Sequence, residues 1–277
     1  MLYLVATPIG NLMDITLRAI QVLNEVEIIA CEDTRISSKL LNHYGISKTL
    51  FPYHDHNADQ VRPRLLKLLK EGKNVAYITD GGMPLISDPG FKLVRSCQKE
   101  SLPYTVIPGP SAPLMAICLS GLSPDRFLFC GFLSAKQAAR KLALEEIMDI
   151  KATLVFFESP KRLVGFLKDA HEILGNREGV VCREMTKLYE EAQKGSLTLL
   201  IDHYENYPPR GEIVVVIEGA SSVSSFSEED LDAQLEKALA TFSVKEAVDI
   251  VAKICRRSKR EVYQRALTIK SQEARIP

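Results

Sequence analysis

The sequence predicts an α/β fold with two α/β domains and a small helical appendage. Over the first 120 residues, short apolar runs alternate with stretches of helical periodicity, which predicts a mostly parallel sheet covered by helices. After turn-forming residues at 121–125 the apolar runs lie closer together in sequence, which predicts a second, mixed sheet. The 277 residues, 46% of them hydrophobic, suffice for more than one core. We therefore expect domains at 1–120, 121–220 and 228–277.

The first domain is expected to alternate strand and helix. Its predicted strands are residues 2–6, 27–31, 50–53, 75–78 and 104–107. Its predicted helices are residues 17–23, 37–43, 61–70, 88–99 and a segment after Pro110. Ligands of parallel sheets bind beyond the carboxyl ends of the strands. Four loops, at 7–10, 32–33, 79–88 and 108–112, are therefore expected to converge at one edge.

The second domain and the tail follow with different patterns. Predicted strands are residues 126–132, 153–158, 179–185, 196–201 and 212–218, and predicted helices are 136–148 and 160–174. A serine-rich linker at 220–227 precedes helices at 228–240, 244–255 and 259–268. The basic turn at 256–260 is either a solvated run of charge or a contact for RNA phosphates.

The stretch Asn74–Gly90 is predicted to be a ligand cradle. A buried strand runs into a loop containing Gly81, Gly82 and Pro84, and Ser87 or Asp88 is expected to cap the next helix, with Pro89 at its first position. Backbone amides beside a helix N-terminus favour an anionic or carboxylate-bearing ligand. A plain connection is the alternative, since neither common nucleotide-binding glycine motif occurs in the chain.

Charge and cysteine usage narrow the class of protein. Lys plus Arg and Asp plus Glu both number 35, so a polyanion is not expected to be wrapped wholesale, although a local basic face stays open. The six cysteines form no CxxC pair and indicate buried thiols in a reducing compartment. No apolar stretch approaches about 18 residues, so we expect a cytoplasmic protein without a membrane partner.

A series of motifs gives the most specific signal. In order along residues 5–212 stand VATPIGNLMDITLRA, CEDTR, YHDHN, TDGGMPLISDPG, VIPGPSA, FESPKR, REMTK and PPRGE. This series closely resembles the family of 16S rRNA cytidine 2′-O-ribose methyltransferases within the tetrapyrrole methylase (class III) superfamily. The resemblance covers about four-fifths of the chain, and several long blocks would have to coincide in order for it to arise by chance.

The resemblance implies a homodimer that binds S-adenosylmethionine in a cleft between its two α/β domains. It implies a cytidine ribose in the decoding region of 16S rRNA, within the small ribosomal subunit, as the substrate. The expected cofactor contacts are Pro8, Gly10, Asp80, Gly81, Gly82, Pro84, Leu85, Ile86, Asp88, Ser111, Ala112 and Glu212. The family usually has threonine where this chain has Met83, so a contact through that hydroxyl is not expected here.

The reacting ribose hydroxyl is a weak nucleophile that a base or a cation would activate. The candidates for this role, each of which is equally a helix cap or a structural ion pair, are Glu32, Asp33, Arg35, Glu158, Arg183, Glu184 and Lys187. Catalysis by alignment alone is the alternative. The candidates for holding RNA phosphates are Arg35, Lys39, Arg62, Arg64, Lys136, Arg140, Lys161 and Arg162.

Other functions are less favoured by the sequence. His54-Asp55-His56-Asn57 has two histidines and an aspartate but no third ligand cluster, so a metal is not expected. A tetrapyrrole (precorrin-type) substrate would require a broad apolar cleft, to which the charged stretch 136–146 is poorly suited. A ribosome-binding factor without catalysis is a third hypothesis, suggested by Met83 alone.

Overall fold

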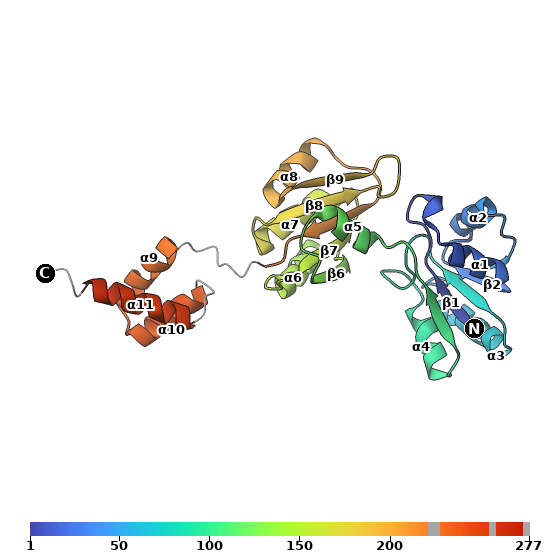
Figure 1. Ribbon diagram of the computed structural model, residues 1–277, viewed down its shortest axis with the longest axis horizontal. Helices are drawn as coiled ribbons and strands as arrows, with labels where there is room; N and C mark the ends of the chain where they lie inside the picture. Colours follow the sequence, from blue (N-terminus) through green and yellow to red (C-terminus); the bar gives the residue numbers. More distant parts are fainter. Residues whose placement is uncertain (221–227, 255–258, 274–277) are drawn as a thin grey trace. The chain divides into compact units, whose positions relative to one another are not determined.

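The computed structural model describes residues 1–220, 228–254 and 259–273 (Figure 1). The chain forms two compact units, residues 1–219 and 220–277. The first unit holds two five-stranded sheets, and the described part of the second consists of helices. The predicted α/β class with a parallel sheet, a mixed sheet and a helical tail is confirmed.

The first sheet has strand order β3-β2-β4-β1-β5 and all of its pairings are parallel. The strands are β1 (Leu2–Val5), β2 (Ile28–Cys31), β3 (Thr49–Pro52), β4 (Val75–Ile78) and β5 (Tyr104–Ile107). On one face pack α1 (Leu17–Glu25) and α2 (Thr34–His43), and on the other α3 (Ala58–Lys70) and α4 (Phe91–Lys99). A short 3-10 turn, η1, spans Leu12–Asp14. Because every strand runs the same way, all five carboxyl ends lie at one edge.

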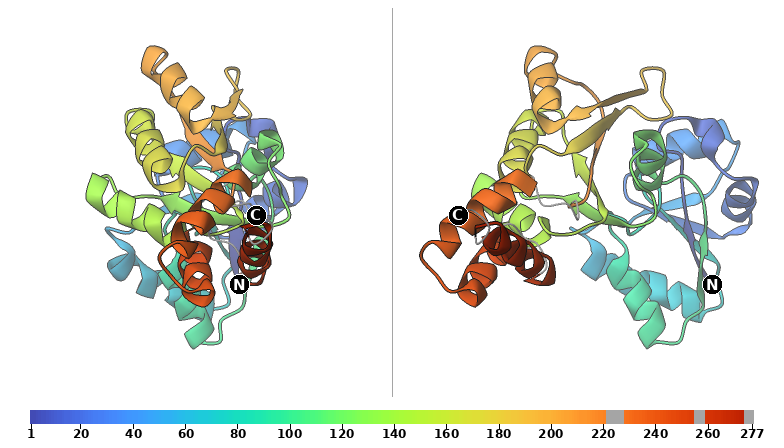
Figure 2. Two further views of the ribbon diagram at one scale, coloured as in Figure 1. Left: turned by 90° about the vertical axis from the view of Figure 1, so that its left-hand side faces the viewer. Right: turned by 60° about the vertical axis from the view of Figure 1, so that its left-hand side comes forward.

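The second sheet has strand order β6-β7-β10-β8-β9, with β6 and β7 parallel and the other pairings antiparallel. The strands are β6 (Phe127–Phe132), β7 (Thr153–Glu158), β8 (Glu178–Arg183), β9 (Glu191–Ser196) and β10 (Ile213–Ile217). Three helices, α6 (Gln137–Ile147), α7 (Leu163–Leu174) and α8 (Leu197–Asn206), lie side by side on one face (Figure 2). The helix α5 (Ala112–Ser120) packs on the other face. A domain division at residue 120 stays a prediction. The helix α5 packs on the second sheet although it lies within the predicted first domain, residues 1–120.

The strand predicted at 196–201 is wrong. The antiparallel edge strand β9 ends at Ser196, and α8 begins at the next residue. The Ser196 hydroxyl caps this helix by accepting the Leu199 amide. Leu197, Leu200 and Tyr204 are all buried, and their helical spacing outweighs the apolar run that resembles a strand.

The predicted start of α4 is also wrong, because neither Ser87 nor Asp88 caps the helix. The N-cap is Gly90, whose φ of 120° lies in a region that side chains rarely adopt. A Cβ at this position would come within 2.5 Å of the Tyr77 ring, and the Tyr77 hydroxyl donates to the Pro89 carbonyl at 2.9 Å. The β4–α4 loop therefore runs from Thr79 to Gly90 and is longer than the sequence predicts.

The second unit has a hydrophobic core of its own. Its helices are α9 (Glu228–Leu239), α10 (Val244–Ile254) and α11 (Lys259–Glu273), which pack through Leu235, Val251 and Val262 among others. Residues 221–227 of the predicted linker and residues 256–258 of the basic turn lie outside the described residues. Five cysteines in the described ranges are free thiols, and Cys255 lies outside those ranges. Cys31, Cys97 and Cys182 are buried as predicted, Cys130 is partly buried, and the prediction is wrong for Cys118, which is exposed. Of the helices described, none has the length and apolarity needed to cross a membrane.

Candidate functional site

Loops from the two sheets of the first unit touch one another at the carboxyl edges of their strands. After β1, the Asn11 amide donates to the Thr186 hydroxyl at 3.0 Å, which joins this loop to the β8–β9 loop. Gly10 is packed so closely that a Cβ there would lie 2.6 Å from Lys187 Cγ and 2.9 Å from the Met185 carbonyl oxygen. A Cβ on Gly131, in β6, would lie 3.1 Å from the Ser87 hydroxyl of the β4–α4 loop. Two separate contacts thus join the sheets at this site.

The β1–α1 and β4–α4 loops are joined by a two-residue antiparallel bridge. Thr7 N donates to Gly82 O and Gly82 N to Thr7 O, both at 2.9 Å. The buried Thr7 hydroxyl also donates to the Thr79 carbonyl at 3.2 Å. Nothing in the sequence marks Thr7 for this role except its place in the VATPIG motif. The Gly82 amide is occupied by this bridge and is not available to a ligand.

The β4–α4 loop has a strained backbone. Leu85 and Ser87 have φ values of 74° and 63°, which are uncommon for residues other than glycine. Such strain persists where the surrounding structure holds it, and it clusters at functional sites. Of the other expected contacts in this loop, Pro84 is buried and Ile86 is exposed. The loop is a fixed structure and not a loose connection.

Three carboxyl groups form an acidic group at the edge of the first sheet: Glu32 after β2, and Asp80 and Asp88 in the β4–α4 loop. Burial, with the nearby charges of Asp80 and Asp88, raises the pKa of Glu32 to about 7. Burial and the charge of Asp80 raise the pKa of Asp88 to about 6. Burial also raises the pKa of Asp80. A cation placed among these carboxylates would relieve their mutual repulsion.

We expect the variant Glu32→Gln to be more stable than the wild type above neutral pH. The folded-state pKa of Glu32, about 7, exceeds the unfolded value of about 4.3, so the folded protein binds the proton of the Glu32 carboxyl more tightly than the unfolded chain does. The free energy of unfolding therefore falls as the pH rises between these two values. Glutamine does not titrate, so the variant does not lose this free energy of unfolding as the pH rises. Thermal unfolding should give a higher Tm for the variant at about pH 8, and the difference should vanish near about pH 4. The exposed Glu146→Gln on α6 serves as control, and an equal response of both variants would contradict the expectation.

A second charged group lies at the edge of the second sheet. The Lys187 ammonium donates to Glu184 at 2.8 Å and to Glu212 at 3.0 Å. Burial disfavours the Lys187 ammonium, but the hydrogen bonds and charges of Glu184 and Glu212 together outweigh burial and raise the pKa of Lys187. The hydrogen bond from Lys187 lowers the pKa of Glu184. Glu184 and Thr186 have φ values of 50° and 65°, so this loop is strained as well.

The remaining candidates have structural partners. Asp33 caps α2 by accepting the Arg35 amide at 2.8 Å, and a hydrogen bond from the Arg35 side chain lowers its pKa to about 2. Glu158 is 3% exposed, accepts the Ser159 amide at 2.7 Å and pairs with Arg162. The Arg183 guanidinium donates to Glu191 at 2.8 Å across the β8–β9 pair.

The other expected cofactor contacts surround the bridge. The position of a Cβ on Gly81 is 3.2 Å from the Pro8 carbonyl oxygen, and that on Gly82 is 3.9 Å from the Pro110 carbonyl oxygen. Ser111 and Ala112, which follow Pro110, are the N-cap and first residue of α5. The structure therefore brings the β1, β4 and β5 loops together, as expected from the parallel sheet.

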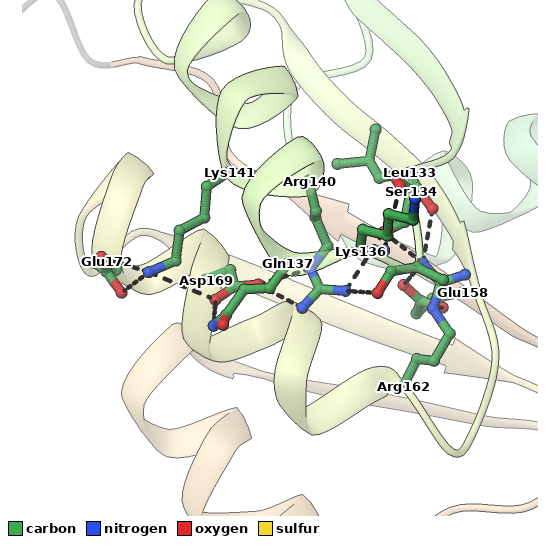
Figure 3. A network of polar contacts seen from close by, with 11 residues as sticks. Leu133, Ser134, Lys136, Gln137, Arg140, Lys141, Glu158, Arg162, Asp169 and Glu172 are labelled. Atoms are coloured by element: carbon green, nitrogen blue, oxygen red, sulfur yellow. Dashed lines mark hydrogen bonds and ion pairs between the residues drawn. The ribbon is translucent and has the colours of Figure 1, made fainter.

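The candidates for an RNA face separate into buried and exposed residues. Arg140 is wrong as a surface contact, because it is 6% exposed and pairs with buried Asp169 at 2.5 Å (Figure 3). The half-buried Arg162 is directed at Glu158 and at loop carbonyls. Arg62 pairs with Asp59, and Arg64 lies over the Phe51 ring at 4.5 Å. The candidates exposed to solvent without such contacts in the described ranges are Lys39, Lys136 and Lys161.

The histidine-containing loop after β3 forms no metal-binding group. His54 and His56 pack edge to face with ring centroids 5.9 Å apart, and the Asn57 side chain accepts the His54 amide. Within the residues that the structure describes, no three His, Cys, Asp or Glu side chains are grouped so that they could hold a metal ion.

Comparison with known proteins identifies the family. Residues 1–201 match the family model described as tetrapyrrole (corrin/porphyrin) methylases, and residues 226–270 match the RsmI C-terminal HTH domain. The ribosomal RNA small subunit methyltransferase I of Mesorhizobium japonicum is 45% identical over 97% of this chain and 92% of its own. The protein of the same name from Haemophilus influenzae is 43% identical over 95% of each chain.

Solved structures support the fold. Diphthine synthase superposes with a TM-score of 0.61 at 16% identity, over 79% of this chain and 89% of its own. Uroporphyrin-III-C-methyltransferase from Thermus thermophilus gives a TM-score of 0.56 at 20% identity, over 78% of this chain and 93% of its own. Matching family models over both units, and relatives of one name over nearly the whole length, show that this chain belongs to the ribosomal RNA small subunit methyltransferase I family, with a tetrapyrrole methylase fold.

Proposed function

We propose that this protein transfers a methyl group from S-adenosylmethionine to the ribose 2′-oxygen of a cytidine in the decoding region of 16S rRNA. The observation that carries the proposal is the 45% identity, over 97% of the chain, to a protein named as a small subunit rRNA methyltransferase. The motif series through residues 5–212 supports the finer choice of a cytidine ribose. The proposed substrate is 16S rRNA within the small ribosomal subunit.

The residues around the β4–α4 loop fit this cofactor. Its methionine end carries an ammonium, a carboxylate and a sulfonium, so it needs acceptors for positive charge and donors for a carboxylate. Glu32, Asp80 and Asp88 supply negative charge, which suits the ammonium and the sulfonium. The Gly82 amide is occupied, the Ile86 amide donates to the Met83 carbonyl at 3.4 Å, and Pro84 has no amide hydrogen. In this proposal the donors for the carboxylate are therefore the amides of Gly81, Met83, Leu85, Ser87 and Asp88. When bound, the sulfonium supplies an activated methyl group.

Pro8, Gly10, Ser111 and Ala112 complete this proposed cofactor site from the β1 and β5 loops. Met83 replaces the threonine usual in the family and supplies no hydroxyl, so binding depends on the backbone and on the carboxylates. Glu212 acts indirectly in this proposal, since its carboxylate holds the Lys187 ammonium at 3.0 Å.

The proposed role of Lys187 is to stabilise negative charge that develops on the ribose oxygen. Its carboxylate partners raise the pKa of Lys187, so the side chain is a cation and not a base at neutral pH. The contact between Lys187 and Gly10 puts the ammonium's loop next to the first loop of the proposed cofactor site. The protein's contribution to the reaction is then alignment plus a fixed positive charge.

We expect Lys187→Met to lower kcat for methyl transfer by about 100-fold, because one preorganised charge at a reacting oxygen is worth a factor of this order. The KM for S-adenosylmethionine should change much less. Steady-state kinetics with small subunits measures both constants. The control is Lys194→Met, which removes an exposed lysine of β9, and the expectation fails if both variants keep wild-type kcat.

The proposed assembly and location follow the family. We propose a homodimer that works in the cytoplasm, where the free thiols of the five described cysteines would stay reduced. Within the first unit we propose two domains, each built around one sheet, with the cofactor at their junction. Light scattering of the purified protein tests the dimer.

The decisive experiment incubates the protein with unmethylated small subunits and S-adenosylmethionine labelled in the methyl group. Label in 16S rRNA at a cytidine that resists alkaline cleavage is the expected result, because a 2′-O-methyl group blocks attack on the neighbouring phosphodiester. Absence of label from 16S rRNA contradicts the proposal. Calorimetry with the cofactor then separates an inactive binder from a protein that takes another substrate, and transfer to a porphyrinoid would indicate a tetrapyrrole methyltransferase.

A further inference from the structure

The segment Phe132–Lys136 connects the end of β6 to the N-cap of α6, and we call it the β6–α6 platform. Side chains of two arginines hold its backbone in place. Arg162 Nη2 donates to the Leu133 carbonyl at 2.7 Å and to the Ser134 carbonyl at 3.3 Å. Arg140 Nη1 lies 3.4 Å from the Ser134 carbonyl and 3.5 Å from that of Ala135. Three successive carbonyl groups are therefore turned toward two internal arginines (Figure 3).

The two arginines are neutralised internally. Asp169 accepts from Arg140 Nε at 2.7 Å and from Gln137 Nε2 at 2.8 Å. Glu158, which is itself buried, lies 3.2 Å from Arg162 Nε. Arg140 is buried and Arg162 is half-buried, and each guanidinium is directed at a carboxylate and at loop carbonyls, so we assign these residues to positioning the platform and not to contact with a polyanion. A platform fixed in this way loses little conformational freedom when it binds a ligand.

The platform presents an aromatic ring and a cation. The Phe132 side chain is 58% exposed, although it packs on Phe157 with ring centroids 5.3 Å apart, and Phe157 packs in turn on Phe129 at 4.9 Å. Lys136 is exposed at the end of the platform, and exposed Lys161 follows β7, the neighbouring strand. An exposed, supported ring on a segment that ends in an exposed lysine matches a nucleotide, which offers a flat base and a phosphate.

The platform also lies next to the proposed cofactor site. Gly131 immediately precedes Phe132, and a Cβ on it would lie 3.1 Å from the Ser87 hydroxyl of the strained β4–α4 loop. Phe157, which supports the ring, precedes Glu158 at the carboxyl end of β7. A base stacked on Phe132 would therefore hold its ribose near the loop that we assign to the cofactor.

We propose that the β6–α6 platform binds the nucleotide to be methylated, with the base stacked on Phe132 and a phosphate held by Lys136. This inference rests on the proposed function, since it names the part of the protein that holds the RNA. A target base has to leave its stack to reach an enzyme site, and an aromatic face replaces the lost stacking. Arg140 and Arg162 are positioning residues for this contact.

Three variants of Phe132 separate stacking from packing. Phe132→Tyr keeps a flat ring, Phe132→Leu keeps apolar contact with Phe157 but has no ring, and Phe132→Ala removes both. We expect kcat/KM for unmethylated small subunits to be near the wild-type value for tyrosine and to fall at least about fivefold for leucine and alanine, since stacking of one base contributes about 1 to 3 kcal/mol. Unchanged affinity for S-adenosylmethionine in calorimetry shows that the variants are folded.

The leucine variant decides the outcome. Wild-type kcat/KM with Phe132→Leu overturns the inference while the proposed function stands. A wild-type protein that transfers no methyl group to 16S rRNA defeats the proposed function instead, so the two failures are distinguishable.

A fluorescence measurement tests the contact directly. The chain contains no tryptophan, so Phe132→Trp introduces a single indole at the platform. A short single-stranded RNA with the sequence around the proposed target cytidine should quench its emission by stacking. Leu142→Trp, at a residue of α6 that is 61% exposed, is the control and should keep its emission. Equal emission changes in both variants, or none at Phe132→Trp, contradict the inference.

Lys136 is tested by salt dependence. Lys136→Ala should weaken RNA binding and lower the slope of log affinity against log salt concentration by about one, because one phosphate contact is lost. Lys151→Ala removes an exposed lysine that precedes β7, at the opposite edge of the second sheet, and should leave the slope unchanged. Equal slopes for the Lys136 variant and the wild type overturn this part of the inference.

Discussion

The variant Asp169→Ala is expected to lower the free energy of unfolding of the first unit by about 3 to 5 kcal/mol. Asp169 is 1% exposed and accepts hydrogen bonds from Arg140 and Gln137. Its removal leaves the guanidinium of Arg140, a residue only 6% exposed, without its counter-charge. An unpaired buried charge costs more free energy than the pair itself contributes, so the loss is large.

A matched control and a double variant test this explanation. Glu172→Ala removes an exposed carboxylate of the same helix that pairs with Lys141, and its effect should stay within about 1 kcal/mol. Replacing Arg140 and Asp169 together by leucine should cost less than Asp169→Ala, since no charge is left buried. Urea unfolding followed by circular dichroism measures all three. A loss for Asp169→Ala no larger than that for Glu172→Ala would contradict the assignment.

The parallel character of the first sheet and the mixed character of the second could be predicted, because they depend on local patterns, whereas the strand order and the position of β9 were not predicted. Apolar runs such as Val75–Ile78, separated by amphipathic helices, require parallel neighbours, and the close spacing of later runs requires antiparallel ones. Convergence of the β1, β4 and β5 loops follows from the same pattern, because parallel strands end at one edge.

Features that depend on contacts distant in sequence could not be predicted. The start of α4 at Phe91 is set by Tyr77, whose ring excludes a side chain at Gly90. Arg140 has the sequence appearance of a surface cation, but Asp169, on the next helix, makes it internal. The bridge between Thr7 and Gly82 joins loops more than 70 residues apart, so a strand-loop pattern in either segment does not reveal it. The acidic group of Glu32, Asp80 and Asp88 arises in the same way, from two loops.

The acidic group also changes the interpretation of the cradle. The sequence predicts an anionic or carboxylate-bearing ligand, because a loop with two glycines precedes a helix expected to begin at Asp88 or Pro89. The helix begins at Phe91, and the nearby side chains are carboxylates with raised pKa values. A ligand with both charges satisfies the amides and the carboxylates together, which is why the zwitterionic end of S-adenosylmethionine fits better than a simple anion.

The variant Gly10→Ala is expected to lower kcat/KM for methyl transfer by about 10- to 100-fold, because small displacements of aligned reacting groups have effects of this size. The added methyl group would meet Lys187 Cγ and Thr186 Oγ1 at 2.6 Å and the Met185 carbonyl oxygen at 2.9 Å. The side chains can move aside, but the carbonyl belongs to a backbone that cannot move without shifting the strained residues Glu184 and Thr186. The β1 loop and the Lys187 loop therefore separate.

The expected loss of kcat/KM in Gly10→Ala comes from the displacement of the two loops and not from a loss of folding stability, and the two causes can be separated by measurement. Gly165→Ala adds the same methyl group on α7, where its nearest neighbour is Arg140 Nη2 at 3.8 Å, so kcat/KM should stay at the wild-type value. If Gly10→Ala acts by separating the two loops, it lowers kcat/KM while the Tm changes little. Adding Lys187→Met to Gly10→Ala should then lower kcat/KM only slightly further, because both substitutions disrupt the same arrangement. If instead the two losses multiply, Gly10 and Lys187 act independently and the junction of the loops is not where the reaction is aligned.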